Sequence, residues 1–191
     1  ERISIEDTIT KKEYYRFKLS EISLIDEIKK GEKRVINNQS VMIAYRLNSD
    51  GTILPISKSD DKYNDKYFVY FPTVIRTHLE YLVHAPFKTT PGREGIKEVE
   101  ANDILYESIM RLVVYSLFYL IDRKEITHDF YNFILLPTKD TDSRILMPKL
   151  KDILHKALIH GIKILPASNG GYTSLQEILI EKYTTKEKGR L

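Results

Sequence analysis

The longest regular pattern in the sequence is a helical one near the middle of the chain. From Asp103 to Asp122 apolar residues recur three or four positions apart, and Asn102 stands where an N-cap is expected. A helix of this length with one apolar face needs a second layer to pack against. The apolar positions are Ile104, Leu105, Ile109, Leu112, Val113, Leu117 and Leu120.

The first ninety residues are expected to form that second layer as strands. Strand-like runs lie at residues 2–6, 13–19, 41–47, 52–56, 67–71 and 81–87. The Asp50-Gly51 turn between two of these runs predicts a hairpin, and Pro72 is expected to end the run at 67–71. Residues 22–30 are ambiguous, because their apolar spacing also suits a short amphipathic helix ended by Gly31. The sequence therefore predicts an α+β fold, with a largely antiparallel sheet packed by one long helix.

Shorter elements are predicted after the long helix. Helices are expected at residues 128–135, 150–159 and 174–182, a buried strand at 162–165, and a tight turn at 168–172. Residues 138–143 have the composition of a linker. We therefore expect an α+β domain over residues 1–137 and a small, mainly helical subdomain over residues 144–191. The charged ends, with no initiator methionine, lead us to expect a fragment of a larger protein.

Composition excludes several classes of site. The 191 residues include no cysteine, so disulfides and thiolate zinc sites are excluded, and a reducing, cytoplasmic location is expected. The net charge of +3 is too small to indicate a nucleic-acid partner by itself. No uninterrupted apolar run reaches the roughly 18 residues of a membrane span, and there is no signal peptide, so no membrane partner is expected.

Motifs for a complete active site are absent from the sequence. The five histidines lack the spacing of metal ligands, so no metal site is predicted. There is no cysteine nucleophile, no Gly-x-Ser-x-Gly elbow and no Walker loop. We therefore expect no enzymatic activity from the chain on its own and no cofactor bound by it alone.

One turn nevertheless has the composition of an anion site. Residues 89–92 (TTPG) join a buried strand to the approach of the long helix, and Arg93 projects from that turn. Arginine suits phosphate because its planar guanidinium donates two parallel hydrogen bonds and stays charged. The alternative is a surface ion pair between Arg93 and a nearby glutamate. The candidates are Glu94, Glu98 and Glu100.

Three blocks of sequence around this turn resemble bacterial sacsin-like ATPases, relatives of the heat-shock chaperones (HtpG in bacteria). They are YFPT at residues 70–73, LVHAPFKTTPGRE at residues 82–94 and NDIL at residues 102–105. The resemblance covers about residues 41–120, with a looser continuation through residues 164–172. It implies a middle domain with the fold of the second domain of ribosomal protein S5.

In those chaperones an arginine in a comparable turn reaches the γ-phosphate of ATP held by the N-terminal domain. The resemblance gives that role to Arg93, with Thr90 and Gly92 beside the phosphate, although Gly92 stands where the chaperones have serine. It places ATP and Mg²⁺ in the parent protein, bound by a GHKL-type domain upstream of Glu1. Glu98 and Asn102 match that domain's Glu-x-x-x-Asn box, but the chain has no Asp-x-Gly-x-Gly loop for adenine.

The resemblance thus predicts a transducer segment of a chaperone-like ATPase. Its expected partners are the upstream ATP-binding domain and a client protein, with a second copy of the chain as a further candidate. Two alternatives remain. One is a nucleic-acid-binding module built on the basic cluster Lys29, Lys30, Lys33 and Arg34, against which the interspersed acidic residues argue. The other is a protein-interaction module in which Arg93 is only structural.

Overall fold

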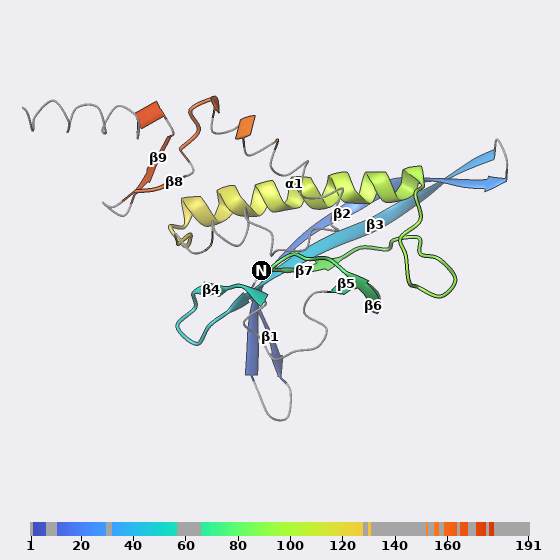
Figure 1. The fold of residues 1–191 in the computed structure, drawn as a ribbon, viewed down its shortest axis with the longest axis horizontal. Helices are drawn as coiled ribbons and strands as arrows, with labels where there is room; N and C mark the ends of the chain where they lie inside the picture. Colours follow the sequence, from blue (N-terminus) through green and yellow to red (C-terminus); the bar gives the residue numbers. More distant parts are fainter. Residues whose placement is uncertain are drawn as a thin grey trace, which may run out of the picture.

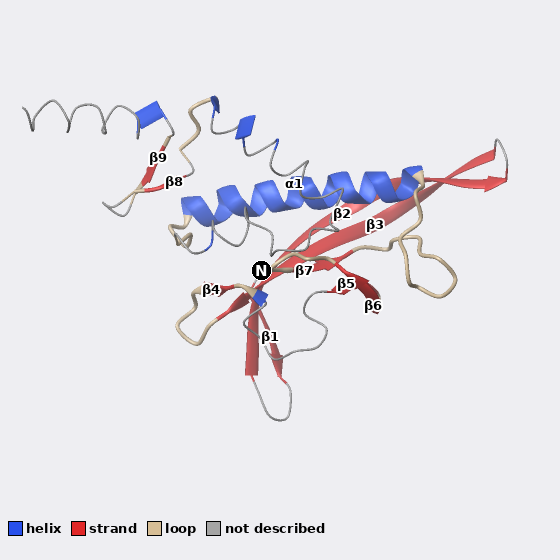
Figure 2. Ribbon diagram, in the orientation of Figure 1, coloured by secondary structure: helices blue, strands red, loops and turns tan. Residues whose placement is uncertain are grey.

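The described residues form a mixed β-sheet with one long helix on one face (Figure 1). The computed structural model describes residues 2–6, 11–29, 32–56, 66–127, 130, 152, 155–156, 159–163, 165–167, 171–174 and 176–177. Helix and sheet make two layers, as the colouring by secondary structure shows (Figure 2). The predicted α+β class is confirmed.

The sheet contains seven strands. They are β1 (Arg2–Glu6), β2 (Lys11–Lys29), β3 (Glu32–Leu47), β4 (Ile53–Leu54), β5 (Lys66–Val69), β6 (Phe71–Arg76) and β7 (Leu82–His84). Six of them follow the order β1-β2-β3-β7-β5-β6, and β4 pairs with the end of β3. All neighbours are antiparallel except β5 and β7, which run parallel. The prediction of a largely antiparallel sheet is therefore confirmed, with one parallel pair.

The long helix, α1, spans Glu100–Asp122 and begins three residues before the predicted start at Asp103. Strand residues alternate between the two faces of a sheet, so Ile43 and Tyr45 of β3 point toward α1. Both are at most 1% exposed, and the Tyr45 hydroxyl lies 2.8 Å from Ser116 Oγ on the helix. Burial of the Tyr45 phenol raises its pKa. The core therefore lies between α1 and this face of the sheet.

By length and composition alone, α1 could also cross a membrane. Its most apolar window has a mean hydropathy of 1.6, so the sequence argument against a spanning segment does not hold for this helix. However, twelve of its 23 residues are buried. Burial against a sheet explains the same apolar composition, because a core helix passes the same criterion.

The helix considered for residues 22–30 is wrong, because these residues continue β2 to Lys29. Ile22 pairs with Gln39, Leu24 pairs with Ile36, and both apolar side chains are buried. The alternation of these two residues suits a strand, and the neighbouring strand supplies the hydrogen bonds that a helix would otherwise make. The β2–β3 hairpin consequently extends beyond the N-terminal end of α1 (Figure 1).

The strand predicted at residues 67–71 is present as β5 (Lys66–Val69), but its predicted end at Pro72 is wrong. The chain reverses at Tyr70, which has a φ of 62°, and Pro72 lies inside β6. Val69 then pairs with Phe71 across the turn. Pro72 is tolerated because β6 is an edge strand of the sheet. The Asp50-Gly51 hairpin, by contrast, is confirmed, with Gly51 at a φ of 87° and β4 paired with β3.

Beyond α1 the structure describes only parts of the chain. The helix and linker predicted at residues 128–135 and 138–143 lie largely or wholly outside the described residues, so the domain boundary stays a prediction. The described residues within 152–159 are helical, and Gly161 follows at a φ of 73°. The strand predicted at 162–165 is instead β8 (Leu165–Pro166), which pairs with β9 (Tyr172–Thr173) around the predicted turn, while Ile162 is exposed.

Glu177 helps to begin the last predicted helix. Its carboxylate accepts hydrogen bonds from the Ser174 backbone N–H and from the Thr173 hydroxyl, and its own N–H donates to Ser174 Oγ. This reciprocal arrangement is a capping box. An ion pair with Lys163 and these hydrogen bonds lower the pKa of Glu177 to about 2. The helix start expected at Ser174 is thus confirmed, and the rest of that helix lies outside the described residues.

Candidate functional site: the Arg93 loop

Residues 88–97 form a small closed loop between β7 and α1. Thr89 and Ile96 form an isolated antiparallel bridge, and the Lys97 N–H donates to the Lys88 carbonyl at 2.9 Å. Further in, the Thr90 N–H donates to the Gly95 carbonyl at 2.9 Å. The Gly95 N–H donates to the Thr90 hydroxyl at 3.1 Å. These bonds satisfy the backbone across the neck of the loop and fix its shape.

Asn102 ties the neck of the loop to the helix. Its side-chain oxygen accepts from the Lys88 N–H at 2.9 Å, and its Nδ2 donates to the carbonyls of Lys88 at 2.9 Å and Lys97 at 2.7 Å. Asn102 is only 1% exposed. The N-cap role predicted for Asn102 is wrong: the N-cap is Val99, which makes no side-chain cap. The amide is used to hold a loop, which a sequence pattern at the start of a helix does not reveal.

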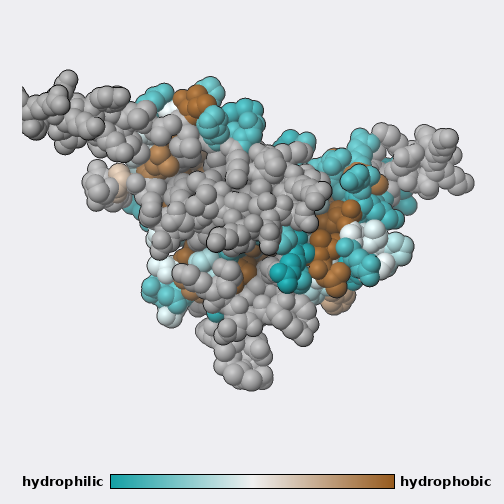
Figure 3. Space-filling view, in the orientation of Figure 1, coloured by the Kyte–Doolittle hydropathy of each residue, from teal (hydrophilic) through white to brown (hydrophobic). Residues whose placement is uncertain are grey.

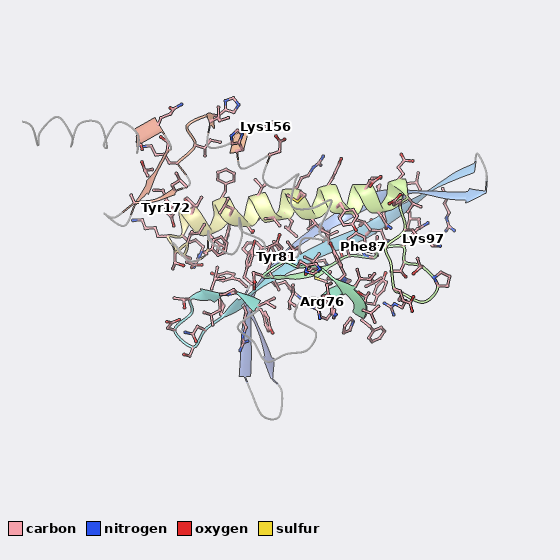
Figure 4. The ribbon with its side chains drawn as sticks, viewed as in Figure 1. Arg76, Tyr81, Phe87, Lys97, Lys156 and Tyr172 are labelled. Carbon is pink, nitrogen blue, oxygen red and sulfur yellow. The ribbon has the colours of Figure 1, made fainter. Side chains whose placement is uncertain are left out.

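An aromatic cluster anchors the approach to the loop. Phe87, labelled in Figure 4, packs edge-on against Tyr67 at a centroid distance of 5.4 Å and lies 4.9 Å from the ring of Tyr106 on α1. Burial raises the pKa of Tyr106 to about 12 and raises that of Tyr67 as well. Both side chains are buried and pack in the core. The loop thus leaves the core at Phe87, which is itself buried.

Arg93 lies at the tip of this loop in a left-handed backbone conformation, with a φ of 55°. Such a conformation costs a non-glycine residue about 1 kcal/mol, and the surrounding hydrogen bonds hold it in place. The Arg93 N–H donates to the Thr90 carbonyl at 2.8 Å. The side chain is half-buried, and its Nη2 donates to the Val69 carbonyl at 2.6 Å. Arg93 therefore bridges its own loop to the turn between β5 and β6.

Arg93 forms no ion pair within the part of the chain that the structure describes. The alternative of a surface pair with a nearby glutamate is therefore not seen for Glu94, Glu98 or Glu100. A guanidinium carries five N–H donors, and the bond to Val69 uses one of them. The others remain available to an anion that approaches the exposed side of the loop.

Thr90 and Gly92, the two other predicted phosphate-binding residues, take different positions. The Thr90 hydroxyl is used inside the loop, where it accepts from the Gly95 N–H. A Cβ at Gly92 would lie 3.4 Å from the side chain of Glu94, so this carboxylate lies over Gly92. The structure thus gives Thr90 a role in loop shape, and it places a negative charge near the tip that an incoming phosphate would have to displace.

Exposed aromatic side chains flank the site. Tyr70 and Phe71, on the turn that Arg93 contacts, are 71% and 70% exposed, and Val74 on β6 is 64% exposed. In the space-filling view, brown apolar surface lies near β5 and β6 beside teal polar surface (Figure 3). Sequence reasoning missed this feature because Tyr70 was assigned to the interior of a strand. Glycine or asparagine in a sequence indicates a turn with a positive φ, whereas tyrosine does not.

Other predicted chemistry is only partly described. Of the basic cluster considered for nucleic acid, Arg34 is exposed on the β2–β3 hairpin. Lys30 lies outside the described residues, and the side chains of Lys29 and Lys33 are not described either. Among the described residues, no group of three or more histidine, aspartate or glutamate side chains could hold a metal ion.

Comparisons with protein-family models, with curated proteins and with solved structures gave no match for this chain.

Proposed function

We propose that this chain is the middle, transducer segment of a chaperone-like GHKL ATPase, with a domain like the second domain of ribosomal protein S5. In this proposal Arg93 reaches the γ-phosphate of ATP held with Mg²⁺ by an upstream domain of the same protein. A client protein and a second copy of the chain are further proposed partners, and the cytoplasm is the proposed location. The sequence resemblance motivates the proposal.

One structural observation supports it most directly. The guanidinium of Arg93 is positioned by a bond to a backbone carbonyl and has no carboxylate partner in the described part of the chain. A carbonyl fixes the direction of the side chain without neutralising its charge. An arginine held in this way can stabilise the negative charge that gathers on the phosphoryl oxygens in the transition state.

The loop is also built for little movement on binding. Asn102 joins both sides of its neck to α1, and Val69 holds the guanidinium. A preorganised group loses less conformational freedom when the anion arrives, so more of its electrostatic stabilisation is available to the reaction. Domain closure would then be the step that brings ATP to Arg93.

The test is ATP turnover by the full-length parent protein. Arg93→Ala should lower kcat by roughly 10³ to 10⁵, the range seen for arginine fingers, and should change nucleotide affinity only a few-fold. Arg111→Ala is the matched control, because Arg111 is an exposed arginine of α1 and should leave turnover unchanged. The 191-residue chain alone should hydrolyse no ATP. Turnover of the Arg93→Ala protein at the wild-type rate would refute the proposal.

A protein-interaction role without catalysis is the second candidate. The exposed side chains of Tyr70 and Phe71 favour it, since adjacent exposed aromatic residues are typical of binding surfaces. The double substitution Tyr70→Ser and Phe71→Ser separates the two candidates. Loss of partner binding with normal ATP turnover, together with normal turnover of Arg93→Ala, would favour the interaction role.

A further inference from the structure

Strand β2 has an outer edge, the side that does not pair with β3, and only part of this edge is paired. β1 pairs with it from Lys11 to Tyr15, whereas β2 continues to Lys29 and pairs with β3 on its other side. Beyond Tyr15, no strand of the described residues pairs with the outer edge. An unpaired edge presents N–H and C=O groups to which another strand can bind.

A bulge limits the length of this unpaired edge. Between Leu19 and Ile22, β2 has one residue more than β3 has opposite it. Glu21 lies in this bulge with a φ of 62°. A bulge bends a strand and interrupts pairing along its edge. The stretch between β1 and the bulge with which a partner strand can pair is therefore short, residues 17–20.

Aromatic side chains of α1 lie beside this stretch on the helix side of the sheet. The ring of Tyr115 is T-shaped to the ring of Phe17 at a centroid distance of 6.5 Å, and the ring of Tyr119 is T-shaped to Phe17 at 5.5 Å. Phe17 is buried, but Tyr115 is 61% exposed. A strand added at the edge would bring the side chain opposite Phe17 close to Tyr115, which favours an apolar side chain there.

The other face of the same stretch is basic. Successive strand residues point to opposite faces, so Lys18 points away from α1. Lys18 is exposed and makes no ion pair within the part of the chain that the structure describes. A carboxylate opposite Lys18 on a neighbouring strand would be favoured, and a second lysine would be disfavoured. Residues 17–20 of a second copy (FKLS) contain no carboxylate, so the charge favours a different partner.

We propose that the outer edge of β2 at residues 17–20 binds an extended segment of a partner protein in which apolar and acidic side chains alternate. The segment adds a strand to the sheet through main-chain hydrogen bonds. Its apolar side chains lie against Phe17 and Tyr115, and its carboxylates lie beside Lys18. β6 is at the opposite edge of the sheet, so this surface is distinct from that of Tyr70 and Phe71 and does not depend on the function proposed for Arg93.

Backbone hydrogen exchange tests the added strand. The probe is the capped peptide Ac-Val-Glu-Val-Glu-Val-NH2, added to the 191-residue chain, with an expected dissociation constant of about a millimolar. Amides of successive strand residues point to opposite edges, so alternate amides within residues 17–20 should exchange about tenfold more slowly with saturating peptide. No added protection would overturn the proposal. Outward amides that are already protected without peptide, and lose this protection on dilution, would overturn it in favour of a second copy.

A charge reversal tests which face the carboxylates occupy. Ac-Val-Lys-Val-Lys-Val-NH2 keeps the backbone and the apolar residues and reverses the charge, so it should bind about fivefold more weakly than the acidic peptide. In Lys18→Glu the order of the two affinities should invert, because the new carboxylate favours the lysine peptide. An unchanged order in Lys18→Glu would overturn the proposed pairing with residue 18.

Removing an exposed ring tests the apolar face. Tyr115→Ser should lower the affinity for the acidic peptide by about threefold, because the ring beside the edge is lost. Phe118→Ser is the matched control: Phe118 is 39% exposed on the same helix, its ring stacks on no described ring of β2, and its loss should leave the affinity unchanged. The amide spectrum of each variant reports whether it has folded. Unaltered affinity in a folded Tyr115→Ser chain would overturn the proposed contact.

Discussion

Two basic residues share an unusual backbone conformation. One lies before helix α1 and the other lies after it. Arg93 precedes α1 with a φ of 55°, and Lys124 follows it with a φ of 57°. For a residue with a Cβ, this left-handed region costs about 1 kcal/mol. The two residues differ in what their side chains do. That difference separates a conformation required by the fold from one that also positions a functional group.

At Lys124 the backbone alone explains the conformation. The Lys124 N–H donates to the Ile121 carbonyl at 2.9 Å, and the Glu125 N–H donates to the Leu120 carbonyl at 3.0 Å. This pair of bonds is the Schellman motif, which needs a left-handed residue after the C-cap, here Arg123. The Lys124 side chain is exposed and makes no described interaction, so glycine could replace it.

At Arg93 the side chain is used as well. Its Nη2 bonds to the Val69 carbonyl at 2.6 Å, and the loop that carries it is held by the buried amide of Asn102. A positive φ by itself therefore does not mark a functional residue. The combination of strain, a side chain fixed by a neutral acceptor and a neck tied to the core is what distinguishes Arg93 from Lys124.

Removing the Asn102 side chain, which joins the neck of the loop to α1, should have the largest effect on stability. Asn102→Ala leaves the Lys88 N–H and the carbonyls of Lys88 and Lys97 without their buried partner. Each unsatisfied group costs one or more kcal/mol, so we expect a loss of about 3 kcal/mol in the free energy of unfolding, measured with urea. Hydrogen exchange at the Lys88 amide should accelerate more than exchange in the middle of α1.

Asn37→Ala is the control for this change. Asn37 is exposed on β3, and its side chain accepts one hydrogen bond from Ser23. Its replacement should alter stability by less than about 0.5 kcal/mol. If the two asparagine variants lost equal stability, the amide of Asn102 would not be what holds the loop.

The difference between α1 and the Arg93 loop also shows what the sequence could predict. The helix was found because its apolar period is repeated over many residues, and the Asp50-Gly51 hairpin because glycine is the residue that favours a positive φ there. Residues 22–30 were ambiguous because Ile22 and Leu24 also suit a helix face, and only the paired strand decides between the two.

Four features of the site had no local signal. The turn at Tyr70 lacks glycine or asparagine, and the conformation of Arg93 is likewise set by hydrogen bonds within its loop rather than by residue type. The sequence predicts Asn102 as the N-cap of the helix, whereas its side chain bonds to Lys88, 14 residues away. The carbonyl that orients Arg93 lies 24 residues away, on a turn that the sequence did not predict.

Replacing the strained residue after α1 should have a smaller effect, and a favourable one. Lys124→Gly keeps the Schellman bonds and removes the cost of a Cβ at positive φ, so we expect about 1 kcal/mol of added stability in thermal or urea unfolding. Arg111→Gly provides the opposite control, since glycine in an exposed helical position should cost about 1 kcal/mol. A loss of stability in Lys124→Gly would mean that the lysine side chain contributes more than the structure shows.

The smallest net change is expected for Arg93→Gly, and the comparison with Lys124→Gly makes it informative. Glycine should again relieve about 1 kcal/mol of strain, but here the hydrogen bond to the Val69 carbonyl, of about the same value, is lost. The two terms nearly cancel, so the unfolding free energy of Arg93→Gly should stay within about 0.5 kcal/mol of wild type. If Arg93→Gly instead stabilised the chain as much as Lys124→Gly, the bond to Val69 would contribute nothing to stability. The hydrogen bond to Val69 would then not hold the guanidinium in place, and the reason for distinguishing Arg93 from Lys124 would disappear.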